Sequence, residues 1–287
     1  MIGTMLALGF PLLLHIGASI SLTSFTVHWS TVVGLVALAA LYEWRARTTP
    51  DAAPRRGQRV AFHAALAVIF FALNGWLHDL SDYYLFSAHM VQHLLLTILV
   101  PPLLIAGTPG GMLRPALRSA AVARIARALT NPKFCFAAFN LVLAGWHLPP
   151  LYNTAMAHHG VHIVQHLMFM TASVLLWWPI LSPLPELPRL SYPMQMLYLF
   201  LTTIPMSIVA VYITYGGTLL YPAYAAAPRI VRLSPLDDQL LGGLIMWIPG
   251  GLVFFAVITV IFFRWQSHGA EDTAASAQVD WQPAAHG

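Results

Sequence analysis

Charged side chains are scarce in this chain of 287 residues, since Asp, Glu, Lys and Arg make up only 8% of it. A soluble domain carries about 25% charged residues. So few charges cannot cover a water-exposed surface, which excludes an ordinary soluble protein. The formal net charge of +4 does not indicate nucleic-acid binding, because the arginines lie in short loops between hydrophobic runs.

Cysteine is nearly absent as well. The single Cys135 cannot form a disulfide within one chain, and it cannot build a thiolate metal site alone. We interpret it as a small buried apolar residue. The sequence therefore excludes a disulfide framework.

Long apolar runs make up most of what remains. Hydrophobic residues account for 58% of the chain, and runs of about 20 of them are long enough to cross a bilayer as helices. The runs do not alternate as the strands of a membrane barrel do. The sequence predicts an all-α polytopic transmembrane bundle over residues 28–265. Its seven spans are expected near residues 29–44, 60–78, 88–106, 134–150, 161–181, 193–215 and 239–263.

Two terminal segments flank this bundle. Residues 1–24 are apolar but contain His15 and several hydroxyl residues, so both a leader and an eighth N-terminal helix remain open. Residues 266–287 are polar and Ala-rich, which predicts a disordered tail. The chain is thus divided into residues 1–24, 28–265 and 266–287.

Basic residues predict the orientation. Arginine and lysine cluster after the first, third, fifth and seventh spans, which lie on one side if the spans alternate. The positive-inside rule makes that side cytoplasmic and places the C-terminus there. Only Arg229 and Arg232, between the sixth and seventh spans, fall on the other side.

A string repeats within the predicted bundle. His-x-Val-Gln-His-Leu begins at His89 and again at His162, and each copy follows a Gly-Trp pair, at Gly75 and Gly145. Both units run in the same direction, so we predict a parallel internal repeat of two helical hairpins. Histidines at i and i+4 share one helix face, and the repeat would bring two such pairs together.

Histidine is concentrated at one side of the predicted membrane. Nine of the 13 histidines map to the non-cytoplasmic ends of spans: His28, His78, His89, His93, His147, His158, His159, His162 and His166. Ionisable residues in a membrane indicate a function by default. Hydrogen-bonded structural histidines are the alternative for any single pair.

Softer donors map to the same region. Imidazole and thioether ligands without thiolate suit copper, above all Cu(I). Carboxylates such as Asp79 could orient a ligating imidazole, whereas we expect Asp82 to be a solvated loop residue. The thioethers that reach this region are Met90, Met156, Met206 and Met246. The predicted metal ligands are His89, His93, His162 and His166, supported by His147, His78 and Met90.

At these residues the chain resembles the integral-membrane CtaG family of cytochrome c oxidase assembly factors, from about residue 28 to 263. The matching strings are His-Met-Val-Gln-His-Leu-Leu-Leu at 89–96, Pro-Pro-Leu-Leu at 101–104, Trp-His-Leu-Pro at 146–149, the second histidine pair, Trp-Trp-Pro at 177–179, Leu-Tyr-Pro at 220–222, and Asp-Gln…Gly-Gly…Met-Trp-Ile-Pro-Gly at 238–250.

The resemblance implies a non-enzymatic role in maturing haem–copper oxidases. It implies a multi-pass protein of the bacterial inner membrane that delivers copper to oxidase subunits within the bilayer. The alternative is a membrane redox protein in which histidines from facing helices, such as His89 and His162, ligate a b-type haem axially.

The predicted topology can be tested with reporter fusions. A reporter that is active only in the periplasm should give signal when inserted in the 216–237 loop and none when fused after Gly269, because the basic loops hold the other side in the cytoplasm. The reverse pattern would put the histidines on the cytoplasmic side and contradict the predicted orientation.

Overall fold

The computed structural model describes residues 25–279, and within that range the chain forms helices and turns without strands. The predicted all-α class is confirmed. The predicted leader, residues 1–24, and the last tail residues, 280–287, lie outside the described range. The rest of the predicted tail lies in the final helix, which continues past the predicted boundary to Val279.

The helices follow one another with short connections. In chain order they are α1 (Trp29–Thr48), η2 (Pro50–Ala52), α2 (Arg56–Leu73), α3 (Gly75–Tyr83), α4 (Phe86–Leu94), η3 (Leu95–Leu99), α5 (Val100–Gly107), α6 (Gly110–Leu113), η4 (Arg114–Arg118), α7 (Ala120–Leu129), α8 (Pro132–His147), α9 (Pro149–Ala157), α10 (His159–Leu181), α11 (Tyr192–Thr214), η5 (Pro222–Tyr224) and α12 (Pro235–Val279).

Fewer helices qualify as membrane spans than the seven predicted. Within residues 25–279, α2, the run from α4 to α5, α10, α11 and α12 are long and apolar enough to cross a bilayer. The α8–α9 pair, bent by 73°, is a sixth if it counts as one span. The remaining predicted span is helix α1. It ends in Glu43, Arg45 and Arg47, whose charges lower its mean hydropathy.

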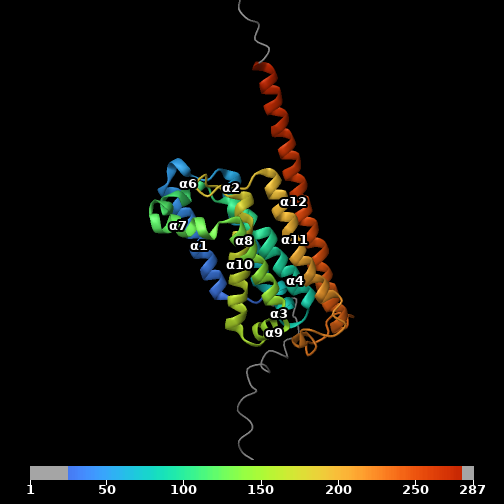
Figure 1. The fold of residues 1–287 in the computed structure, drawn as a ribbon. Coiled ribbons are helices and arrows are strands. Elements are labelled where there is room, and N and C mark those ends of the chain that lie inside the picture. The colour runs from blue at the N-terminus through green and yellow to red at the C-terminus, as the bar shows by residue number, and fades with distance from the viewer. Residues whose placement is uncertain (1–24, 280–287) are drawn as a thin grey trace, which may run out of the picture.

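The two ends of the bundle differ in composition. Figure 1 shows α3, α9 and the loop after α11 at one end, and α6 and α7 at the other. The second end is basic and tied together by polar contacts: Arg45 donates to the Met112 carbonyl at 2.9 Å, and Arg114 pairs with Glu186 at 2.6 Å. The predicted histidine helix starts therefore lie away from most of the basic loops.

The two predicted hairpins have a similar order of elements. In each, a long helix ends at a bend, a nine-residue helix follows (α3 or α9), and the next helix carries a His-x-x-x-His pair near its start. The internal repeat itself stays a prediction.

Prolines change the helix that carries the first histidine pair. Pro101 has no N–H, so the Thr97 carbonyl four residues earlier loses its helical partner. A π-helical turn, η3, occupies this position, and the Trp177 indole of α10 donates to the Thr97 carbonyl at 3.1 Å. This hydrogen bond therefore ties α10 to the turn where the regular helical hydrogen bonding is interrupted.

Helix α12 packs closely on its neighbours because two glycines face them. A Cβ at Gly242 would overlap the Phe86 ring, and one at Gly243 would lie 2.9 Å from the Thr214 backbone nitrogen. One turn earlier, the buried Asp238 carboxylate accepts the Phe86 N–H at 2.7 Å and the Ser87 N–H at 3.2 Å. Asp238 therefore caps the N-terminus of α4 from another helix, where a negative charge is favourable.

Removing this cap should destabilise the fold. Asp238→Ala leaves two buried N–H groups without an acceptor, and we expect the free energy of unfolding to fall by about 2 kcal/mol. Asp237→Ala is the matched control, because Asp237 is exposed and caps only its own helix through Ser234. Reversible unfolding in detergent measures both. Equal losses would contradict a special role for Asp238.

Candidate functional site

Four imidazoles meet between α4 and α10. Helical spacing places the two rings of each pair next to each other, with ring centroids 4.2 Å apart for His89 and His93 and 4.5 Å apart for His162 and His166. Across the helices, His89 lies 5.8 Å from His162, and His93 lies 5.6 Å from His166. All four are buried. The structure thus brings the two predicted pairs together.

The tightest group of potential ligands includes a residue that we expected in solvent. Ligand atoms of Asp82, His89 and His162 all lie within 4.8 Å of one another, and we call these three residues the rim group. The Asp82 side chain is only 9% exposed, so the expectation of a solvated loop residue is wrong. The sequence feature that could have predicted this burial is the position of Asp82 four residues after His78, which puts both side chains on one face of α3.

The charge of Asp82 is stabilised by its neighbours. Burial by itself raises the pKa of the carboxyl. His162 and His78 beside it lower the pKa by more than burial raises it, so the pKa lies well below its usual range. Its Oδ2 atom lies 3.4 Å from His162 Nδ1 and 3.4 Å from His78 Nε2. The rim group therefore contains a carboxylate at neutral pH.

His78 has a different environment from the paired histidines. The Gln92 amide nitrogen, which can only donate, lies 3.3 Å from His78 Nδ1 and 2.7 Å from the Ala72 carbonyl. Nδ1 is then the acceptor, so Nε2 carries the proton and faces Asp82. This places His78 behind the carboxylate, as a residue that orients Asp82 rather than one that offers a free lone pair.

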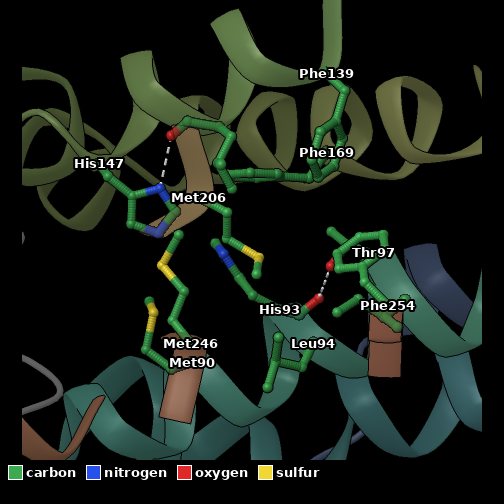
Figure 2. Close-up of a pocket in the computed structure, with 12 residues that line it drawn as sticks. Met90, His93, Leu94, Thr97, Phe139, His147, Phe169, Met206, Met246 and Phe254 are labelled. Atoms are coloured by element: carbon green, nitrogen blue, oxygen red, sulfur yellow. Dashed lines mark hydrogen bonds between the residues drawn. The ribbon is translucent and has the colours of Figure 1, made fainter. Parts of the chain in front are cut away.

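The other predicted ligands lie further into the bundle. His147 ends α8, and its ring lies 6.0 Å from that of His93. Met90, on α4, is fully buried and lines a cavity with both of these histidines. Figure 2 shows this group, which is separate from the rim group.

Not every histidine at this end of the bundle joins the site. His158 and His159 are exposed at the start of α10. His28 stacks edge-on against His78 at 4.4 Å and so extends the row of rings outwards. His63 lies elsewhere and bonds Glu43 at 2.9 Å. The row therefore runs from His28 and His78 through the rim group to His93 and His147.

Tyrosines from the loop after α11 close the site. Tyr224 donates to the Ser81 carbonyl at 2.8 Å and shares a 2.9 Å hydrogen bond with Tyr152. Tyr221 donates to the His147 carbonyl at 2.8 Å. These bonds join α3, α8 and α9 to the loop. Tyr221 lies in the Leu-Tyr-Pro string at 220–222, but that string did not predict which groups the tyrosines would bond.

Many imidazole nitrogens at this site have no protein partner. Among residues 25–279, no hydrogen bond reaches either nitrogen of His89, His93 or His166, or Nε2 of His147 and His162. Buried polar atoms are normally hydrogen-bonded, because burying them alone costs free energy. Such a collection of lone pairs beside a carboxylate suits a bound cation.

The fold and this cluster define a polytopic helical protein with a buried histidine–carboxylate site near one end of its bundle. The chain belongs to the cytochrome c oxidase caa3 assembly factor family (Caa3_CtaG), whose family model matches residues 35–268. The resemblance seen in the sequence motifs is thereby confirmed.

Curated relatives are more distant. Proteins of unknown function from Mycobacterium bovis and Mycobacterium tuberculosis are each 25% identical over 203 residues. Each alignment covers 63% of this chain and 30% of the relative, so the chain spans less than a third of their length. No solved structure matches the chain significantly.

The two repeated strings allow a matched test of the hydrogen-bond network. Gln92→Leu breaks the bonds to Ala72 and His78 and leaves a buried carbonyl without its donor, so unfolding should become easier by about 1–2 kcal/mol. Gln165→Leu should be neutral or stabilising, because neither amide atom of Gln165 has a partner within residues 25–279. Equal effects on the measured unfolding free energy would contradict this asymmetry.

Proposed function

We propose that this assembly factor binds copper at the rim group and supplies it to a haem–copper oxidase in the same membrane. Family membership supports the oxidase-assembly part of the proposal. The rim group supports the copper part of the proposal, since the ligand atoms of Asp82, His89 and His162 lie within 4.8 Å of one another in a buried position.

The geometry of the rim group is close to that of a metal site. A metal–imidazole bond is about 2 Å long, so two ligand atoms on one ion lie at most about 4 Å apart. The three side chains would need to close by less than about 1 Å. His162 Nε2 and either nitrogen of His89, depending on its tautomer, are free to ligate, while His78 holds Asp82 from behind.

The donor set favours copper over the harder cations. Imidazole suits copper and zinc, whereas magnesium and calcium require several oxygen ligands. Only one carboxylate belongs to the rim group, and no thiolate is near. His93 and His166, one helical turn further in, offer additional nitrogens along the same row.

The packing speaks against the haem alternative. The cavity of about 20 Å³ beside His93 and His147 has room for roughly one water molecule. At His89, the Tyr152 ring lies only 5.3 Å from the imidazole ring. A porphyrin between α4 and α10 would have to displace these side chains.

We place the site on the periplasmic side of the bacterial inner membrane, with the C-terminus of the chain in the cytoplasm. Copper would enter at the end that carries α3, α9 and the loop after α11 (Figure 1). The ion is cargo in this proposal, and the protein binds and hands it over without a catalytic step.

Substitution of the rim group tests the proposal. His89→Ala and His162→Ala should each weaken Cu(II) binding by more than about tenfold, and the double variant should nearly abolish it, because each change removes a ligand of the rim group. Asp82→Asn should weaken Cu(II) binding as well. The measurement is the Cu(II) affinity of the purified protein, together with the activity of the oxidase in cells that carry each variant.

His159→Ala is the matched control, since His159 is exposed on the same helix as His162. It should bind Cu(II) as tightly as the unmodified protein. Undiminished Cu(II) binding by the His89→Ala/His162→Ala protein would contradict the proposal, and a Soret band in the unmodified protein would favour haem instead.

A further inference from the structure

A small cavity lies deeper in the bundle than the rim group. It measures about 20 Å³, which is room for roughly one water molecule or one ion. Its walls come from α4, η3, α8, α10, α11 and α12, and its histidines and methionines are His93, His147, Met90, Met206 and Met246. We call it the deep cavity. Figure 2 shows the side chains of the three methionines close to the two imidazoles.

The hydrogen bond of His147 fixes which of its nitrogens is free. Nδ1 lies 2.7 Å from the Leu143 carbonyl, which can only accept, so Nδ1 carries the proton. Nε2 is then left with a lone pair, and it has no partner within residues 25–279. A backbone carbonyl that orients an imidazole in this way is typical of a metal-ligating histidine.

The rest of the lining offers no donor to this lone pair. A thioether sulfur is only a weak acceptor. The Thr97 hydroxyl, which also lines the cavity, donates to the His93 carbonyl at 2.6 Å. Both histidines are more than nine-tenths buried, and both His93 nitrogens are without a partner in the described chain. The imidazole nitrogens and thioether sulfurs thus bring several lone pairs to the cavity, and Phe139, Phe169 and Phe254 form part of its apolar wall.

We propose that the deep cavity is a second copper site, specific for Cu(I), in which His93, His147 and the thioethers of Met206 and Met246 are the ligands. Neutral nitrogen and thioether donors without a carboxylate select a soft monovalent ion. His147 also ends α8, where the helix dipole favours a cation.

The second site differs in chemistry from the rim group and adjoins it. Asp82 makes the rim group harder, so that group accepts divalent ions, whereas the deep cavity contains no carboxylate. His93 connects the two, since its ring lies 4.2 Å from that of His89. The inference deepens the proposed function by giving copper a second position further along the row, but the two sites can be tested separately.

The test uses full-length protein purified in detergent and loaded with Cu(I) under ascorbate without oxygen. X-ray absorption should detect sulfur ligands in the unmodified protein. Met206→Leu/Met246→Leu, which conserves side-chain volume, should lose that sulfur signal and about one equivalent of Cu(I) in competition with a Cu(I) chelator. Zn(II) binding should be unchanged, because the rim group is intact.

Met168→Leu/Met194→Leu is the matched control, since both side chains are exposed, Met168 on α10 and Met194 on α11. This variant should keep the sulfur signal and the copper content. Sulfur ligation that persists in Met206→Leu/Met246→Leu, or copper held only by nitrogen and oxygen in the unmodified protein, would overturn the second site.

Different results would refute the two proposals. His89→Ala/His162→Ala should lose Zn(II) and keep sulfur-ligated Cu(I). If this variant retains Zn(II), the rim group is not a metal site, while the deep cavity still stands on its own sulfur signal. If the sulfur signal is absent throughout while Zn(II) depends on the two histidines, only the deep cavity is refuted.

Discussion

Four imidazoles lie buried between α4 and α10, and most of their nitrogens have no partner within residues 25–279. A buried polar atom without a partner costs about 1–3 kcal/mol, so this cluster has to be held in place by interactions elsewhere. Trp177 bonds the Thr97 carbonyl that Pro101 leaves free, and Asp238 anchors the first turn of α4. The rest of the bundle thus stabilises a cluster that is itself unfavourable.

The ligand chemistry changes along the row of histidines. The outer part contains a carboxylate, Asp82, held between His78 and His162. One helical turn further in, the paired rings supply only nitrogen, and the deep cavity adds thioethers and phenyl rings. Harder donors at the mouth and softer ones inside suit an ion that binds from water and is kept in a reduced, poorly hydrated form within the protein.

The short helices and the last loop shape the entrance to this row. Helix α3 turns back at Gly75, whose φ of +66° suits glycine, and so carries His78 and Asp82 against α4. Tyr224 then bonds Ser81, and Tyr221 bonds the end of α8, so the loop after α11 closes over both hairpins.

The sequence alone determined the class, the positions of the main helices and the family. Continuous apolar runs allow only helices in a bilayer, and helical spacing puts His89 with His93 and His162 with His166 whatever surrounds them. It could not determine that Asp82 is buried, because the burial of a side chain in a short helix depends on how that helix folds back.

Other features also depended on tertiary contacts. Charges at the end of α1 reduced the count of spans, and the 73° bend after His147 placed that ring beside His93 instead of extending α8. The deep cavity draws its lining from helices that are far apart in the chain. The sequence placed Met90, Met206 and Met246 on the same side of the predicted membrane as the histidines, but it could not show that they meet. Only the packing angles of those helices decide that three thioethers and two imidazoles share one small space.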